Sequence, residues 1–275
     1  MKDSERVPTD GGVSMDEWER PSLFPNTYVQ IITYVLLGAF LIWNAVEVRM
    51  TPSRLLIGIE DGLTLVTSMF PPDFGSKSGL IISGTLQSIK MSVIATIVGI
   101  VLGVPIAFLA AENLVPRTVY LINRSVILFA RAFHSLIVAI IVVKAVGFGP
   151  VAGIITLVIK TIGFFSRLLA DELEDIDDGM LEAVRATGAS RLQVFTYAVL
   201  PQAMPRVVGL SIYQWDINIR QSTVIGIVGA GGIGITLMNS FKLYDYDLSM
   251  AIILVIIGLV LIGEGVSKVA RERVT

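Results

Sequence analysis

Charged residues stand inside segments of this chain that are otherwise long and apolar. Six that we single out are Lys90, Arg124, Arg131, Lys160, Asp216 and Arg220. A charged side chain that faces lipid costs about 3 kcal/mol or more, so we expect each one to face protein, water or an interface. All of them except Asp216 are basic. Net positive charge inside a membrane domain favours a path that carries an anion.

Some of these charges also have a simpler interpretation. Arg124 lies near the end of its apolar segment, so we expect its side chain to reach the lipid headgroups. Asp216 and Arg220 are four residues apart on one helix and can pair with each other. The deeper basic candidates for the path are Arg131, His134 and Lys160.

Two helical segments carry stripes of polar or small residues. In segment 207–228 the spacing of three and four residues places large polar side chains on one face, and we predict that this face lines the path. Its path residues are Gln214, Asn218, Arg220, Ser222 and Thr223. In segment 83–111 the stripe consists of small residues, and we predict that it allows close packing against another helix. Its members are Thr85, Ser88, Ser92, Thr96, Gly99 and Gly103.

The sequence GAGGIG at residues 229–234 formally matches a dinucleotide-binding pattern. That pattern requires a preceding strand within a βαβ unit, whereas here it follows an apolar segment. We instead expect glycines to end a helix and allow close backbone approach near an outer gate. The gate residues are Gly229, Gly231, Gly232 and Gly234.

The composition is that of a membrane protein. Of 275 residues, 53% are hydrophobic and 16% are charged, whereas a soluble domain has about 25% charged residues. The net charge of -2 argues against a nucleic-acid partner. The absence of cysteine excludes disulfides and thiolate chemistry. We find no phosphate-binding loop and no metal-ligand cluster, and we predict no catalytic residue and no metal site.

The elements that must position these residues are long apolar helices. A span needs about 20 apolar residues, and the chain offers six such segments, at 28–46, 83–111, 119–143, 146–170, 207–228 and 248–266. The amphipathic segment 55–70 is shorter and is expected either along the outer interface or as a packed external loop. Residues 1–25 are polar and are expected to be a disordered tail before a transmembrane domain at 26–275.

Charge also predicts an orientation. With six spans, both termini lie on one side, and that side carries more Lys and Arg than the other. The positive-inside rule then places both termini in the cytoplasm. Residues 171–204 face the cytoplasm in this topology.

The cytoplasmic segment contains the sequence EAVRATGASRLQVFTYAVLP at residues 182–201. Leu181 and Val184 share one face of a short helix, which Gly188 can end in the left-handed conformation. Ser190 is a suitable N-cap for a second helix. The apolar stripe of that helix is expected at Leu192, Phe195 and Val199. The pattern predicts a helix–turn–helix whose first helix projects outward.

This segment resembles the conserved cytoplasmic loop of ABC importer permeases. The signature of that family is Glu-Ala-Ala, three residues, Gly, nine residues, an aliphatic residue, one residue and Leu-Pro. The matching residues are Glu182, Ala183, Gly188, Leu200 and Pro201, and the departures are Val184 and Ala198. Over most of the chain the sequence is similar to the permease of phosphonate-type importers, most closely in FPPDF, GFGPVAGI and RQSTVIGIVGAGGIG.

The resemblance implies the all-α type I importer permease fold of six transmembrane helices. The loop would be a coupling helix that inserts into a groove on a separate ATPase subunit. The implied coupling residues are Glu182, Ala183, Arg185, Gly188, Leu200 and Pro201. The implied cargo is a phosphonate or a close oxyanion such as phosphite, moved by alternating access.

The resemblance also implies partners. They are a second copy of this chain, two ATPase subunits that bind ATP and Mg, and a periplasmic or lipid-anchored solute-binding protein. The chain would lie in the bacterial inner membrane among lipids, would bind no cofactor itself and would not be an enzyme on its own.

Other functions stay open at this point. Methionine-type permeases share the motif, but their cargo is a zwitterion, which the net positive charge in the membrane disfavours. A secondary transporter that works without an ATPase often shows inverted repeats, and we find none. A structural scaffold would leave the buried charges unexplained.

Overall fold

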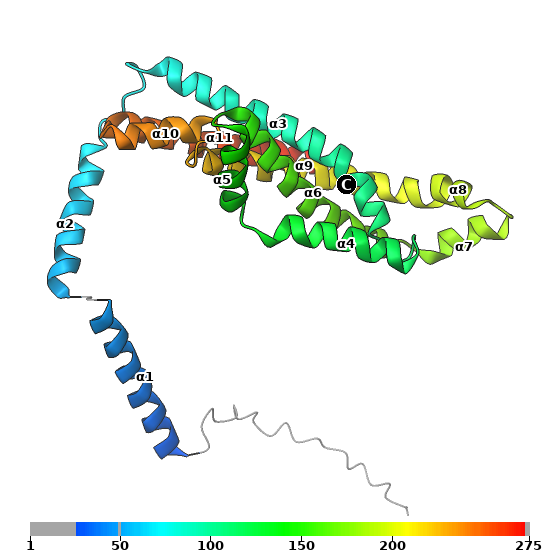
Figure 1. Ribbon diagram of the computed structural model, residues 1–275, viewed down its shortest axis with the longest axis horizontal. Coiled ribbons are helices and arrows are strands. Elements are labelled where there is room, and N and C mark those ends of the chain that lie inside the picture. The colour runs from blue at the N-terminus through cyan, green and yellow to red at the C-terminus, as the bar shows by residue number, and fades with distance from the viewer. Residues whose placement is uncertain (1–25, 49–50, 273–275) are drawn as a thin grey trace, which may run out of the picture. The chain divides into compact units, whose positions relative to one another are not determined.

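The computed structural model describes residues 26–48 and 51–272, and these residues form helices joined by short loops (Figure 1). The elements are α1 (Thr27–Glu47), α2 (Pro52–Ser68), α3 (Ser78–Leu109), α4 (Arg117–Ala132), α5 (Ser135–Val146), α6 (Pro150–Glu174), α7 (Asp178–Ala186), α8 (Arg191–Val194), the π-helix η1 (Phe195–Val199), α9 (Leu200–Gly226), α10 (Ile233–Lys242) and α11 (Tyr246–Glu272). The described ranges contain no strand, which confirms the all-α prediction. The predicted tail at 1–25 lies outside the described residues.

The chain divides into two units at residue 63, inside α2. In the first unit, α1 has no buried residue although its sequence is apolar on all sides. Such a surface suits contact with lipid or with another apolar protein surface. The helix predicted at 55–70 is present as α2, while its place along the membrane interface stays a prediction.

Four described helices are long and apolar enough to cross a membrane, namely α1, α3, α6 and α11. The predicted span at 119–143 is a broken pair, because α4 and α5 meet at an angle of 89°, and counting this pair as one span gives five. The predicted span at 207–228 falls almost wholly in α9, which ends at Gly226. This helix is not among the candidates because polar residues such as Gln214 and Asp216 interrupt its apolar sequence. The prediction of six spans is therefore not confirmed.

The second unit is a bundle in which α3 packs along α6 and α9 (Figure 1). The small residues of α3 from Ser88 to Gly103 are buried at this contact. A Cβ on Gly99 would lie 2.4 Å from Cγ2 of Thr161, so only glycine allows the two helices to approach this closely. The packing role predicted for the α3 stripe is confirmed.

Candidate functional site

The helix–turn–helix predicted from residues 182–201 lies at one end of the bundle, where α7 and α8 project beyond the other helices (Figure 1). The N–H of Gly179 donates to the carboxylate of Asp177 at 2.9 Å, which caps the start of α7. Gly188 has a φ of +78° and its N–H donates to the carbonyl of Arg185 at 3.0 Å. This is the left-handed helix end predicted for Gly188.

The second helix starts after Ser190, as predicted. The side-chain oxygen of Gln193 accepts a hydrogen bond from the N–H of Ser190 at 2.8 Å. This contact is one half of a capping box, which satisfies a backbone donor that the helix itself leaves free. Both ends of the turn are thus fixed by local hydrogen bonds.

The inner face of the helix pair rests on the bundle. Leu181 is 3% exposed and belongs to an apolar cluster with Leu169 and Leu173 of α6. The rings of Phe108 and Phe195 meet edge to face with centroids 5.1 Å apart. A movement of α7 therefore reaches α6 through packed side chains rather than through a loose loop.

One detail of the predicted apolar stripe is wrong. Leu192 is 74% exposed, whereas Val194 and Ala198 are buried in its place. Two residues along a helix correspond to a rotation of about 200°, so Leu192 faces away from the side on which Val194 is buried. The π-turn at residues 195–199 widens the inward face to include Phe195 and Val199, and single π-turns are frequent at functional sites.

The outer face carries the side chains of the importer motif. Glu182, Ala183 and Pro201 are exposed and Leu200 is half-buried, whereas Arg185 is exposed on the side of α7 that borders a pocket next to Leu181. Large apolar side chains are exposed beside them, namely Met180, Leu192 and Tyr197. A short capped helix with apolar and charged groups on its outer face is suited to a helix-in-groove contact with another protein.

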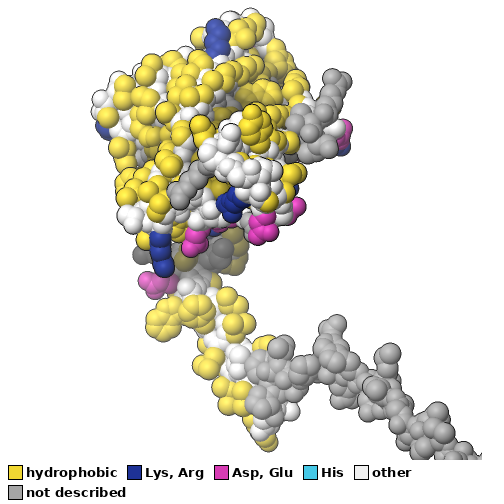
Figure 2. Space-filling view, turned by 90° about the vertical axis from the view of Figure 1, so that its right-hand side faces the viewer, with side chains coloured by type: hydrophobic (Ala, Val, Ile, Leu, Met, Phe, Trp, Pro, Cys, Tyr) yellow, Lys and Arg dark blue, Asp and Glu magenta, His cyan; other side chains and the backbone are white. Residues whose placement is uncertain are grey.

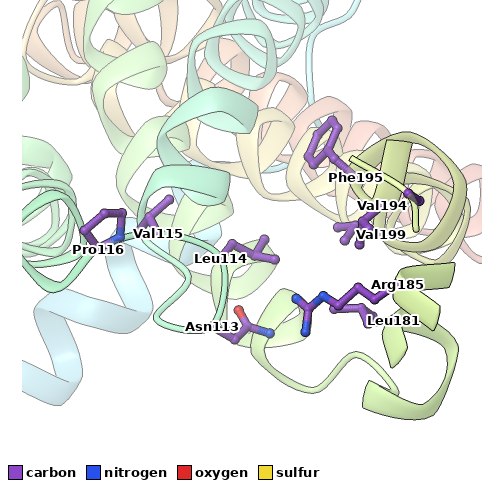
Figure 3. Close-up of a pocket in the computed structure, with 10 residues that line it drawn as sticks. Asn113, Leu114, Val115, Pro116, Leu181, Arg185, Val194, Phe195 and Val199 are labelled. Carbon is purple, nitrogen blue, oxygen red and sulfur yellow. The ribbon is translucent and has the colours of Figure 1, made fainter. Parts of the chain in front are cut away.

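A pocket of about 630 Å³ lies between this helix pair and the loop that joins α3 to α4. Its lining includes Asn113 and Leu114 from the loop, Leu181 and Arg185 from α7, and Phe195 from η1. Arg185 points across the pocket towards Asn113 (Figure 3). Seen from this end, basic and acidic side chains stand out on a mainly hydrophobic surface (Figure 2).

An ion-pair network holds the same end of the bundle together. Arg124 of α4 donates to Asp171 and Glu174 of α6, each at 2.8 Å, and its side chain is 9% exposed. The expectation that Arg124 reaches the lipid headgroups is therefore wrong, because two carboxylates on another helix hold it inside the protein. Sequence reasoning missed Asp171 and Glu174 as partners, and the only sequence signal was their position at the end of an apolar segment.

The polar stripe of α9 faces α3 and α6. The side-chain amide of Asn218 donates to the hydroxyls of Thr96 and Thr161 at 2.8 and 2.9 Å. Gln214 donates to Thr161 at 3.2 Å, and Ser222 and Thr223 bond to carbonyl groups of their own helix. The predicted common face is confirmed for Gln214 and Asn218, but it is buried between helices in this structure, and its role in a path stays a prediction.

The remaining predicted path residues lie at two places. Arg220 pairs with Asp216, as predicted, with Asp216 buried and Arg220 half-exposed. Arg131 and His134 are exposed at the break between α4 and α5, where Lys160 contacts the backbone. Arg220 thus forms an ion pair within α9, and Arg131, His134 and Lys160 form a group of three at the break between α4 and α5.

The glycine loop ends α9 by left-handed turns at Gly229, Gly231 and Gly232. The N–H of Gly232 donates to the side chain of Gln87 at 2.7 Å, and that of Ile233 donates to Ser88 at 2.9 Å. A Cβ on Gly234 would lie 2.0 Å from the carbonyl oxygen of Thr223. The helix break and the close backbone approach are confirmed, and the role as an outer gate stays a prediction.

A bundle of helices long and apolar enough to span a membrane, with a projecting, capped helix pair at one end, is the architecture of a multi-pass membrane protein that can dock another protein. Comparison with known proteins agrees with this class. The chain belongs to the family of binding-protein-dependent transport system inner membrane components, whose profile matches residues 103–275.

Several named proteins are similar in sequence to this chain. The phosphate-import permease protein PhnE of Mycolicibacterium smegmatis is 39% identical over 83% of this chain and 43% of the relative. The phosphite transport system permease protein PtxC of Stutzerimonas stutzeri is 37% identical over 80% of each protein. A probable D-methionine permease, MetI of Vibrio cholerae, is 31% identical over 73% of this chain and 95% of the relative.

The fold is also found among solved structures. A chain from the solved structure of inward-facing conformations of the MetNI methionine ABC transporter superimposes with a TM-score of 0.63 at 22% identity, covering 72% of this chain and 97% of that one. At this identity the likeness establishes the fold, which is the type I importer permease fold expected from the sequence.

Proposed function

We propose that this chain is the membrane-spanning subunit of an ATP-driven importer that moves a phosphonate or a related phosphorus oxyanion into the cell. The observation that carries the proposal is the placement of the motif. Glu182 to Gly188 form an exposed, capped helix end that rests through Leu181 on α6. A partner that moves this helix also moves the bundle, which is the requirement for alternating access.

The choice of cargo rests on two further observations. The relatives named for phosphate and phosphite transport are 39% and 37% identical to this chain, compared with 31% for the methionine relative. Arg124 and Arg220 are paired with carboxylates, whereas Lys90, Arg131 and Lys160 form no ion pair within the described part of the chain. These cations offset the charge of an oxyanion and give no advantage to a zwitterion. Methionine is the alternative cargo.

The proposed assembly contains two copies of this chain, two ABC ATPase subunits that bind ATP and Mg, and an external solute-binding protein, periplasmic or lipid-anchored. The chain lies in the bacterial inner membrane with both termini in the cytoplasm and with lipid around its apolar helices. Catalysis of ATP hydrolysis belongs to the ATPase subunits, and this chain binds no cofactor.

The test is uptake by a strain that lacks only this chain. Methylphosphonate, phosphite, phosphate and methionine are offered separately as labelled solutes. We expect selective loss of methylphosphonate or phosphite uptake, restored by the wild-type chain. Loss of methionine uptake alone would leave the permease class standing and refute the proposed cargo.

A further inference from the structure

The break between α4 and α5 creates a demand for hydrogen-bond donors. α4 ends at Ala132, α5 begins at Ser135, and the chain turns by 89° between them. The last carbonyl groups of a helix have no partner within that helix. Lipid offers no donors, so a helix that ends within a membrane domain needs them from the protein.

Lys160 of α6 supplies these donors. Its Nζ donates to the carbonyl oxygen of Phe133 at 2.7 Å and to that of Ala130 at 3.1 Å. Hydrogen bonds from a charged donor are stronger than neutral ones, and a cation is favoured at the C-terminal end of a helix. Lys160 therefore ties the end of α4, and the turn that follows it, to α6.

Two other basic side chains, Arg131 and His134, lie at the same break between α4 and α5. Arg131 lies in the last turn of α4. The stem of its side chain packs closely against Gly163 of α6, because a Cβ added to Gly163 would lie 3.0 Å from Cγ of Arg131. His134 is the N-cap of α5, and its Nδ1 accepts from the N–H of Leu136 at 3.3 Å. A neutral ring with Nδ1 as acceptor carries its proton on Nε2, which remains a donor.

The three basic residues at the break differ in how many hydrogen-bond donors remain for binding a solute. Two of the three N–H donors of Lys160 are used by backbone carbonyls. Arg131 and His134 are exposed, and within the ranges 26–48 and 51–272 neither side chain forms an ion pair. The sequence alone does not rank Arg131, His134 and Lys160 as ligands for a solute, whereas their contacts in the structure do.

We propose that Lys160 is a positioning residue that fixes the bend between α4 and α5, and that Arg131 and His134 at this bend are the side chains that contact the transported anion. The part concerning the anion rests on the proposed function. Lys160 acts through the backbone that carries Arg131 and His134, and its own charge serves mainly the end of α4.

The bend can be measured without transport, because the chain has no cysteine. Spin labels at Ser125→Cys on α4 and Ile137→Cys on α5, both exposed positions, report the distance across the break by pulsed electron paramagnetic resonance. The sample is the full transporter, with its ATPase and binding protein. Lys160→Met removes the donors and keeps a long stem, and Lys90→Met removes an exposed cation from α3 as a matched control.

We expect Lys160→Met to shift or broaden the distance distribution, Lys160→Arg to restore part of the wild-type distribution, and Lys90→Met to leave it unchanged. An unchanged distribution in Lys160→Met would overturn the positioning role. If Lys160→Met does not assemble, Lys160→Arg together with Lys160→Gln gives the same comparison.

ATP-driven uptake of phosphite tests the anion contacts. We expect Arg131→Gln to raise the KM for phosphite about tenfold without altering the distance distribution, because a charged hydrogen-bond donor is lost from an intact bend. Loss of uptake in Lys160→Met with a wild-type distance would instead assign the direct contact to Lys160. If the wild-type transporter carries no phosphite, the proposed function fails, while the distance measurement still decides the role of Lys160.

Discussion

At the scale of single residues, the sequence predicts best where the controlling contacts are local. The left-handed end at Gly188 and the start of a helix after Ser190 follow from neighbours within four residues, and both are present. The partners of Arg124 lie 47 and 50 residues further along the chain. No local pattern shows such a pairing, and for this reason the headgroup interpretation of Arg124 is wrong.

Gly188 gives a prediction about coupling. Its φ of +78° is unfavourable for a β-branched residue, although a Cβ there would meet open space. We expect Gly188→Val to strain the turn by about 1–2 kcal/mol and to lower ATP-driven uptake. Gly188→Asn is the control, because Asn tolerates this conformation. Equal uptake by the two variants, measured at equal membrane levels, would argue against a role for the turn geometry.

Arg124 gives a prediction about stability. Arg124→Gln removes one ion pair from each carboxylate, so that Asp171 keeps Arg167 and Glu174 keeps the backbone N–H of Glu112; both carboxylates are partly exposed. We expect a loss of about 1–3 kcal/mol, seen as a lower melting temperature in detergent. Arg117→Gln, at an exposed position on the same helix, should melt like the wild type. A melting temperature that is the same for both variants would contradict the network.

At the scale of helices, apolar length and small-residue spacing predict most of the elements. Segments predicted at 28–46, 83–111, 146–170 and 248–266 correspond to α1, α3, α6 and α11. The break inside the segment predicted at 119–143 is hidden because its residues stay apolar on both sides. Lys160 on α6 stabilises the break through its hydrogen bonds to the end of α4. The sequence of segment 119–143 by itself does not show this contact.

Two glycines of α3 form a matched pair for testing the helix contact. A Cβ on Gly99 would lie 2.4 Å from Thr161, whereas one on Gly79 would meet nothing within 4 Å. We expect Gly99→Ala to destabilise the bundle by about 1–3 kcal/mol through overpacking. Gly79→Ala should be neutral or slightly stabilising, because alanine favours a helix. Thermal unfolding of the two variants measures the difference, and a neutral Gly99→Ala would mean that α3 and α6 separate easily.

At the scale of the whole molecule, the sign of the membrane charge and the class of protein follow from the sequence, whereas the division of roles among the charges does not. Gln214 and Asn218 share a face as predicted, yet that face bonds to Thr96 and Thr161 inside the bundle. A periodic pattern states which side chains face the same way. It does not state whether they face water or a neighbouring helix, because that depends on which helices pack together.

The central claim is that movement of the residue 182–201 loop, driven by a separate ATPase, transports a phosphorus oxyanion through this chain. The most direct measurement is phosphite uptake into proteoliposomes that contain this chain, its ATPase and its binding protein. We expect uptake that requires ATP and the ATPase subunit and is strongly reduced by Gly188→Val. Phosphite uptake that proceeds without ATP, or that is unaffected by the ATPase subunit, would contradict the account and indicate a transporter that works alone.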